Sequence, residues 1–261
     1  MTPFYFGEGE RRLLGVYDPA EHAGSRTPQA VVFCAPWGPE YIITHRALRS
    51  LALNLSSAGR HVLRFDYFGV GDSAGEIEEG EFEGWLDDIE MAIEELKSMV
   101  GAPRVSLVGL RLGASMAAEV ASRRTDIDKL TLWDPVVSGS AYLEELDIAH
   151  AAWVRERTRY VPLSPNSVPN RLCHPLPSKL EKQIAAVDLA GLSAKLKQRI
   201  LLVTSEETGA HDSATAALTK VPSNRLTIEC VPDQPPWRLS TLGFGGPMPG
   251  NTLKRITTWM G

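Results

Sequence analysis

The chain has 261 residues, which is enough for one α/β domain with a sizeable core and a small insertion. Its apolar content of 43% and charged content of 23% are ordinary for a globular protein, and the net charge of −5 argues against a broad nucleic-acid-binding surface. No stretch approaches about 18 apolar residues, and the start lacks the basic and apolar regions of a signal peptide, so we expect neither a membrane span nor secretion.

Short apolar runs alternate with longer amphipathic stretches in the first part of the chain. Four apolar runs predict β-strands, at residues 4–6, 13–17, 31–34 and 62–66. Two stretches with apolar residues at helical spacing predict helices, at residues 43–58 and 82–96. A glycine-rich turn over residues 69–75 follows the fourth strand. This alternation predicts a parallel sheet with helices on both faces.

The alternation continues beyond residue 100. Further strands are predicted at 105–108, 130–133, 200–203 and 226–228, with an alanine-rich helix over 112–124 and a terminal helix through Trp259. Residues 137–195 lose the alternation and contain several prolines and a run of charges. We therefore predict an α/β core from residues 1–136 and 196–261, with 137–195 as a helical cap over the carboxyl edge of the sheet, where ligands bind in open α/β folds.

Three segments carry a resemblance to a known family: residues 36–40 (PWGPE), residues 63–73 (LRFDYFGVGDS) and residues 109–114 (GLRLGA). Together they resemble the α/β-hydrolase fold, and most closely its serine-aminopeptidase-like branch, which includes the exosortase-associated hydrolases. The resemblance covers residues 30–136 well and 199–260 loosely. It implies a mostly parallel central sheet flanked by helices, and it implies that some relatives also carry arginine at the elbow.

The resemblance implies a catalytic serine, an acid and a histidine, in that chain order. The serine position of the G-x-S-x-G pattern is Arg111, whose guanidinium keeps its proton in proteins and is neither nucleophile nor general base. Glu206 or Glu207 fits the acid position after the strand at 200–203. No histidine lies between Val231 and the C-terminus, where the third member is expected. We therefore do not expect ordinary acyl-enzyme hydrolysis.

Other side chains can be considered as nucleophiles. Ser115 is expected to be a small packed residue of the helix, and Ser73 is expected to cap its turn. Cys34 ends a buried strand and is expected to be a structural thiol rather than a catalytic one. His211 can enter the site from the side of the acid strand, although a surface position is the more common one for such a residue.

Arg111 is expected at the amino end of a helix, where a cation is unfavourable by about 0.3–1 kcal/mol. A buried guanidinium also requires a negative partner. An internal partner is available in Asp134, with Glu206 or Glu207 beyond it, and a bidentate Arg111–Asp134 pair would replace the triad as a structural link. An external carboxylate or phosphate is the alternative, held by the guanidinium and the helix N–H groups. The two are not exclusive.

The loop that polarises a carbonyl in hydrolases looks better preserved. The backbone N–H groups of Gly38 and Leu112 are placed to contact a substrate oxygen. Trp37 can form an apolar wall or pack against the cap. Glu40 can act as a general base or pair with Arg46 or His45, and the pairing is favoured.

These observations leave several functions open. The first is an enzyme of hydrolase ancestry that acts on a small acyl, ester or thioester substrate in a biosynthetic pathway, with Arg111 anchoring an anionic group. The second is an inactive relative that binds a ligand or a partner protein, and the third is a serine or cysteine hydrolase with a displaced nucleophile. The three widely spaced cysteines fit a reducing cytoplasm. We expect a small-molecule substrate, no nucleic acid, no metal and no cofactor, and we make no prediction for oligomeric state.

Overall fold

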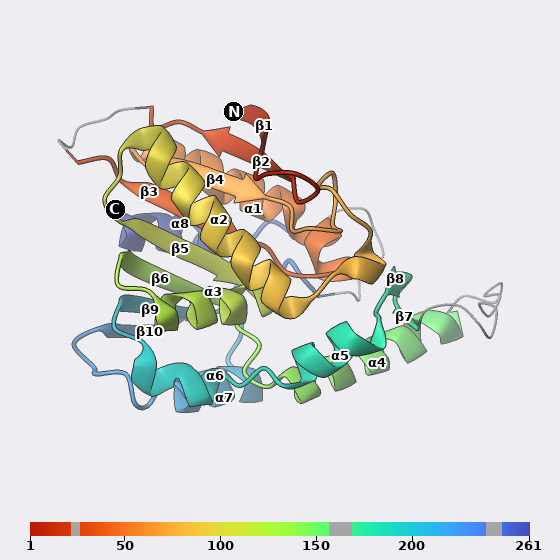
Figure 1. Cartoon of the computed structure of the whole chain (residues 1–261). Helices are drawn as coiled ribbons and strands as arrows, with labels where there is room; N and C mark the ends of the chain where they lie inside the picture. The colour runs from red at the N-terminus through yellow and green to blue at the C-terminus, as the bar shows by residue number, and fades with distance from the viewer. Residues whose placement is uncertain (22–26, 157–168, 239–246) are drawn as a thin grey trace.

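The computed structural model describes residues 1–21, 27–156, 169–238 and 247–261. Within these ranges an eight-stranded sheet has the order β1-β2-β4-β3-β5-β6-β9-β10 (Figure 1). Its strands are β1 (Thr2–Phe6), β2 (Leu13–Asp18), β3 (Ala30–Cys34), β4 (His61–Phe65), β5 (Val105–Leu110), β6 (Ile127–Trp133), β9 (Arg199–Thr204) and β10 (Leu226–Cys230). β2 runs antiparallel to both β1 and β4, and all other neighbouring strands are parallel. The predicted, mostly parallel sheet is confirmed.

Helices cover both faces of the sheet. α1 (Pro39–Ser57) and α8 (Gly250–Met260) contact each other on one face, and α2 (Phe82–Val100) and α3 (Leu112–Arg123) contact each other on the opposite face (Figure 1). Trp85, Ile89, Ile93 and Leu96 of α2 are fully buried, at the spacing that places them on one side of a helix. β3 and β5 are buried along their whole length because both helical layers cover them.

α1 begins earlier than its apolar spacing predicts. Gly38 precedes the helix with φ of 64° and ψ of −133°, and Pro39 occupies the first turn. Proline suits that place because its missing N–H group would have no partner there and its φ is already helical. The early start brings Glu40 into the first turn of α1, next to the carboxyl edge of the sheet.

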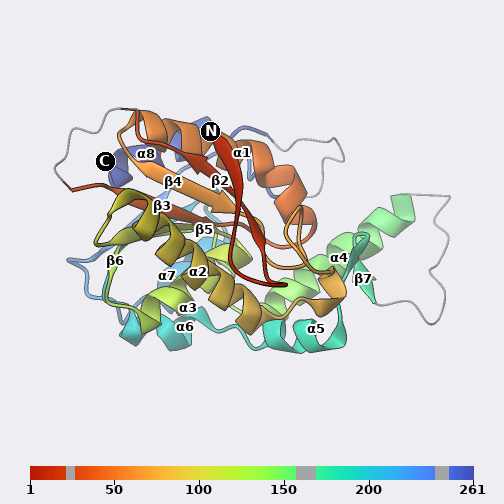
Figure 2. The same ribbon diagram turned by 45° about the horizontal axis from the view of Figure 1, so that its top comes forward.

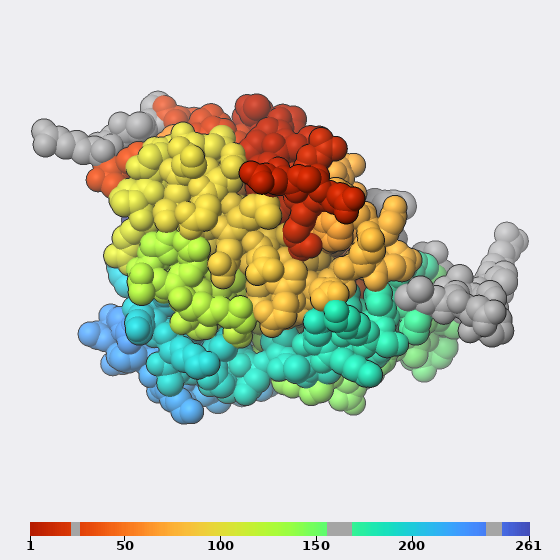
Figure 3. Space-filling model, in the orientation of Figure 1, coloured from red at the N-terminus to blue at the C-terminus, as the bar shows by residue number. Residues whose placement is uncertain are grey.

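The chain between β6 and β9 contains α4 (Gly139–Glu156), the short strands β7 (Asn170–Arg171) and β8 (His174–Pro175), α5 (Ser178–Ala185), α6 (Leu189–Leu192) and a 3₁₀ turn (Ser193–Lys195). α4 and α5 contact each other and lie together beyond the sheet (Figure 2). Gln183 of α5 accepts a hydrogen bond from the backbone N–H of Phe82, and Lys179 pairs with Glu81, so the surfaces of α5 and of the start of α2 meet (Figure 3).

The sequence did not predict the β7–β8 hairpin or α7 (Gly209–Ala217), which follows β9. A further 3₁₀ turn spans Ile77–Glu79. Strands of two residues carry too little pattern to be recognised, and α7 is short, with few apolar residues to mark a helical face. No helix in the described part of the chain combines the length and the apolar character needed to cross a membrane.

The topology gathers several loops at the carboxyl edge of the sheet. Parallel pairing sets Cys34 beside Gly109, Leu110 beside Trp133, and Trp133 beside Val203. The loops that leave β3, β5, β6 and β9 therefore lie next to one another, and ligand sites of open α/β sheets form at such an edge.

Candidate functional site

Arg111 lies at a sharp turn between β5 and α3. Its φ of 54° and ψ of −123° are unusual for a residue with a side chain and cost about 1–3 kcal/mol. Glycines on either side permit the turn: a Cβ on Gly109 would lie 2.4 Å from Cα of Ala114, and one on Gly113 would lie 2.2 Å from the carbonyl oxygen of Cys34. The predicted elbow is therefore present, with an arginine at its tip.

The guanidinium of Arg111 is enclosed by four side chains. Nε donates to Oε1 of Glu40 at 2.8 Å, and Nη2 donates to Oε2 of Glu145 at 2.6 Å. Cζ lies 3.9 Å from the ring centre of Trp237 and 5.4 Å from that of Tyr142. Only 6% of Arg111 is exposed. The two carboxylates supply the negative charge that a buried guanidinium requires.

These charges set the protonation of Arg111. Burial acts to lower its pKa, but attraction to Glu40 and Glu145 outweighs burial, and the pKa rises above its ordinary value. Arg111 is therefore a permanent cation. The two carboxylates together more than neutralise it.

Glu40 is the buried partner of this cation. Oε1 accepts the hydrogen bond from Arg111, and Oε2 accepts one from the hydroxyl of Tyr142 at 3.0 Å, so both oxygens are used. Burial raises the pKa of Glu40, while attraction and hydrogen bonding from Arg111 act to lower it. The predicted pairing of Glu40 with Arg46 or His45 is wrong, because those two side chains lie on the exposed side of α1.

Asp134 follows β6 and binds other groups. Its Oδ1 accepts the backbone N–H of Ser205 at 2.8 Å, and its Oδ2 accepts the Ser205 hydroxyl at 2.6 Å and Nε1 of Trp237 at 2.9 Å. The predicted Arg111–Asp134 ion pair is wrong. Trp237 links the two residues instead, with its ring face on Arg111 and its ring nitrogen on Asp134.

Arg111, Trp237 and Asp134 thus form a connected row. Trp237 lies in the loop after β10, where a histidine was expected. A triad histidine donates one ring N–H to the acid and takes the proton of the nucleophile on its other nitrogen. The indole of Trp237 also donates to Asp134, but it has no basic nitrogen. Trp237 therefore cannot accept a proton as a triad histidine does.

The two remaining predicted residues on the β9 side have partners of their own. Glu206 forms an exposed ion pair with Arg238, with Nη1 and Oε1 2.9 Å apart. Nδ1 of His211 lies 2.7 Å from Oγ1 of Thr204. Neither Glu206 nor His211 contacts Arg111 in the described part of the chain.

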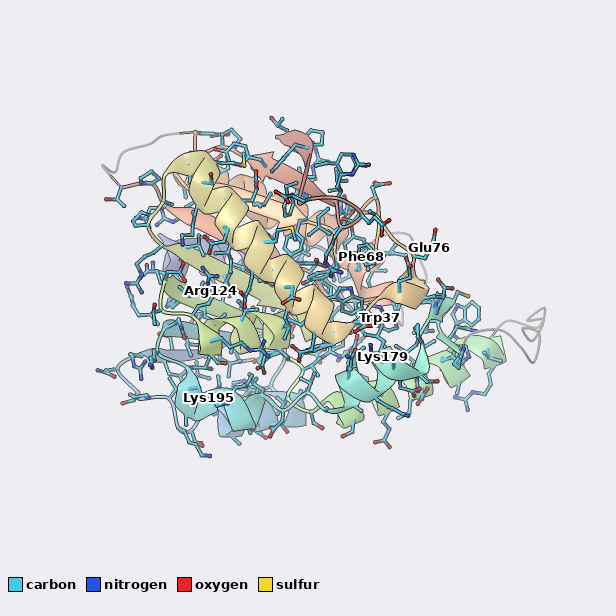
Figure 4. All side chains as sticks on the ribbon, in the orientation of Figure 1. Trp37, Phe68, Glu76, Arg124, Lys179 and Lys195 are labelled. Atoms are coloured by element: carbon cyan, nitrogen blue, oxygen red, sulfur yellow. The ribbon has the colours of Figure 1, made fainter. Side chains whose placement is uncertain are left out.

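The loop after β3 places Trp37 and Gly38 against the β7–β8 hairpin. Trp37 is buried, with its ring centre 6.4 Å from that of His174, and Figure 4 shows it on the side of the sheet that faces α5. A Cβ on Gly38 would lie 3.8 Å from the side chain of His174. Leu112, the first residue of α3, is fully buried. The β7–β8 hairpin therefore covers Trp37 and Gly38.

The residues considered as displaced nucleophiles have structural contacts. The hydroxyl of Ser115 donates to the carbonyl oxygen of Val136 at 2.5 Å, and that of Ser73 donates to the carbonyl oxygen of Asp66 at 2.6 Å. Cys34 is fully buried, and burial raises the pKa of its thiol. A raised pKa leaves the thiol protonated and a poor nucleophile.

Sequence reasoning missed Tyr142, Glu145 and Trp237. Tyr142 and Glu145 are three residues apart on α4 and so share a helix face, but no sequence signal shows which element that face meets. Trp237 stands in the loop after β10, and no sequence motif marks a tryptophan there as a partner of Arg111. No group of histidine, cysteine and carboxylate side chains within the described ranges is suited to hold a metal ion.

Comparisons with known proteins identify the family and the fold. The family model described as serine aminopeptidase, S33 matches residues 39–191. Among solved structures, Est1E from Butyrivibrio proteoclasticus with ferulic acid bound has a TM-score of 0.69 at 15% identity, covering 98% of this chain and 96% of that one. Proline iminopeptidase from Mycobacterium smegmatis has a TM-score of 0.64 at 13% identity, with coverage of 99% and 97%.

A mammalian structure is similar to the same degree. Alpha/beta hydrolase domain-containing protein 10 from mouse has a TM-score of 0.63 at 14% identity, covering 100% of this chain and 97% of that chain. Comparison with curated protein sequences returns no match. At these identities the structural likeness establishes the fold, and the predicted α/β-hydrolase fold is confirmed.

Proposed function

We propose that this chain, which belongs to the serine aminopeptidase S33 family and has the α/β-hydrolase fold, binds a small acyl-bearing molecule without forming an acyl-enzyme. The observation that carries the proposal is the row Arg111–Trp237–Asp134, in which Arg111 stands at the nucleophile position and Trp237 lies in the loop where the histidine was expected. An arginine cannot attack a carbonyl, and an indole cannot accept a proton. At these two positions, the steps that open an acyl-enzyme cycle therefore have no group to perform them.

Ligand binding is supported by a donor that the protein itself leaves unused. Among the described residues, Nη1 of Arg111 has no hydrogen-bond acceptor, and the Arg111 side chain is 7% exposed. The N-terminus of α3 starts beside it and adds a partial positive charge. A ligand oxygen placed here would accept from Nη1 and, in our proposal, from the N–H groups of Gly38 and Leu112.

Aromatic rings supply the apolar part of the proposed site. Trp237 and Tyr142 flank the guanidinium, and Trp37 lies buried in the loop after β3. In the Est1E structure the fold holds ferulic acid, a small molecule with an aromatic ring and a carboxyl group. We take this chemical class as the starting point for a ligand search. Residues 137–195 would serve as the cap, because α4 places Tyr142 and Glu145 on Arg111.

A fluorophosphonate probe tests the absence of a serine nucleophile. We expect no labelling of the wild-type chain, because Ser73 and Ser115 are engaged with backbone carbonyls. The triple variant Arg111→Ser, Trp237→His, Glu40→Gln rebuilds nucleophile and base beside Asp134 and removes the carboxylate that would lose its partner. We expect this variant to become labelled. Labelling of the wild type at any serine would overturn the proposal.

Binding is tested by calorimetric titration of the wild-type chain with ferulate, hexanoate and benzoate. We expect at least one of them to bind stoichiometrically, and we expect binding to be lost in the double variant Arg111→Met, Glu40→Gln. This double variant removes the cation together with its buried partner, so no unpaired buried carboxylate destabilises the folded protein. Binding that is equal in the two proteins would remove Arg111 from the site.

A second candidate is hydrolysis or transfer of a small ester or thioester without a covalent intermediate. The observation that favours it is Glu145, whose carboxylate is half exposed beside Arg111 and can therefore reach a water molecule. Turnover of an S-butanoyl thioester that falls at least tenfold in Glu145→Gln and not in Glu144→Gln would establish this candidate. Equal rates in the two variants would exclude Glu145 as the base.

The proposed ligand is a small molecule, and nucleic acid is not expected at a chain of net charge −5. All three cysteines are free thiols. Free thiols support our expectation of a reducing compartment such as the cytoplasm.

A further inference from the structure

The two carboxylates on Arg111 are held very differently. The Glu40 side chain is 2% exposed, and both of its oxygens are bonded, to Arg111 and to Tyr142. The Glu145 side chain is 48% exposed, and its contact with Arg111 is a single hydrogen bond from Nη2. Glu40 cannot leave without becoming an unpaired buried charge. Glu145 can rotate into water, where its charge is solvated.

We infer that Glu145 occupies the place of a ligand carboxylate, and that the molecules Arg111 selects are small carboxylic acids in their ionised form. This inference rests on the proposed ligand-binding function and names its ligand class. In the ligand-free protein Glu145 closes the site by binding Nη2. A ligand carboxylate displaces it and takes both Nη2 and the unused Nη1.

The geometry of the guanidinium favours a carboxylate over other acceptors. Two N–H donors in a plane match the two oxygens of a carboxylate, and such a bidentate pair is stronger and more directional than a single hydrogen bond. Glu145 uses one of these donors, and Nη1 has no acceptor in the described part of the chain. An external carboxylate therefore gains a hydrogen bond that Glu145 does not make.

The charge balance also allows the exchange. Arg111 faces Glu40 and one more carboxylate both before and after displacement, so the buried cation stays compensated throughout. A neutral ester or amide would displace Glu145 without replacing its charge. We therefore expect discrimination between an acid and its amide, in contrast to a site that recognises only a carbonyl group.

The Glu145 side chain can turn away from Arg111 while α4 stays in its position. Tyr142 lies on the same helix face and stays bound to Glu40 through its hydroxyl. The neighbouring Glu144 is exposed and has no ion-pair partner among the described residues, which makes it a matched control on the same helix. A change at Glu144 alters the net charge equally and leaves Arg111 untouched.

The experiment is calorimetric titration of full-length wild type, Glu145→Gln and Glu144→Gln with hexanoate and benzoate, and with hexanamide and benzamide. We expect Glu145→Gln to bind the carboxylates about fivefold more tightly than wild type, the factor that an exposed ion pair typically contributes. We expect Glu144→Gln to match wild type, and the amides to bind all three proteins more weakly than the acids do.

The outcomes separate this inference from the proposed function. Carboxylates that bind Glu145→Gln and Glu144→Gln equally would overturn displacement of Glu145 while leaving ligand binding intact. Amides that bind as tightly as the acids would overturn the carboxylate class alone. Failure of every acid and amide to bind any of the three folded proteins would overturn both proposals.

Discussion

Two buried cations lie at opposite ends of the central strands, and they are compensated in different ways. Arg111 follows β5 at the carboxyl edge and binds two carboxylates. Lys129 lies near the start of β6, and its Nζ donates to backbone oxygens of Trp259, Met260 and Gly261 at the end of α8, at 2.9–3.1 Å.

The direction of the nearby helix explains this difference. Arg111 caps the amino end of α3, where the helix adds positive charge, so a cation there requires carboxylates. Lys129 meets the carboxyl end of α8, where unpaired carbonyl groups carry negative charge and accept its protons. Attraction to Glu40 and Glu145 keeps the pKa of Arg111 raised, whereas burial lowers that of Lys129.

The largest effect should follow removal of the better-compensated cation. Arg111→Met leaves Glu40 buried without its partner, and we expect the free energy of unfolding to fall by about 3–5 kcal/mol in urea titration. The double variant Arg111→Met, Glu40→Gln should recover a large part of this loss, because no unpaired charge is left. Lys129→Met should cost less than Arg111→Met, since carbonyl groups at a helix end can turn to water.

A single variant that loses less than 1 kcal/mol, or a double variant that recovers nothing, would contradict this reasoning. Either result would mean that Glu40 does not depend on Arg111 for its compensation.

The next effect concerns the ring that links Arg111 to Asp134. Trp237→Phe keeps an aromatic face on the guanidinium and removes the Nε1 hydrogen bond to Asp134, so we expect a loss of about 1–3 kcal/mol in the free energy of unfolding. The matched variant Trp259→Phe, beside Lys129, keeps the backbone carbonyl that contacts the lysine. Equal losses in the two variants would show that the Trp237–Asp134 bond adds nothing.

Much of the fold could be predicted from sequence because its signals are local. The apolar runs of β3 and β5 and the helical spacing of α2 indicate their elements without knowledge of the rest of the chain. The elbow is equally local, since Gly109 and Gly113 flank Arg111 at a fixed spacing. The prediction that Arg111 needs a negative partner also followed from local reasoning about a cation at a helix N-terminus.

The partners of Arg111 could not be predicted, because they depend on distant segments. Glu40 comes from α1, Glu145 from α4 and Trp237 from the loop after β10. The sequence indicates Asp134 as a partner because its strand is adjacent to β5, but a neighbouring strand end fixes the position of a residue and not the direction of its side chain. Trp237 fills the space between the two residues, and only packing of the whole chain reveals that.

A smaller effect is the pH dependence of the free energy of unfolding, which should distinguish Lys129 from Arg111. The lowered pKa of Lys129 means that the unfolded chain binds more protons than the folded chain between that pKa and the ordinary value of 10.5. The free energy of unfolding of wild type relative to Lys129→Met should therefore rise with pH across this window, by less than about 1.4 kcal/mol per pH unit. Urea titrations from pH 7 to 10 measure this difference.

Lys97 provides the control for that slope. A hydrogen bond to Asp126 raises the pKa of Lys97, which moves its window above 10.5. The difference between wild type and Lys97→Met should stay flat from pH 7 to 10. If the difference in the free energy of unfolding between wild type and Lys129→Met were also independent of pH, the backbone oxygens at the end of α8 would be holding Lys129 fully protonated. The pKa of Lys129 would then not be lowered, and the two cations would not differ in this respect.

The smallest effect tests the two carboxylates of Arg111 against each other. Glu145→Gln should change the free energy of unfolding by no more than about 1 kcal/mol, because its ion pair is half exposed and water replaces the lost contact. Glu40→Gln should cost more, since water does not reach its place. If urea titration gave Glu145→Gln the larger loss, Glu145 would be a fixed support of the elbow, and no ligand carboxylate could take its position.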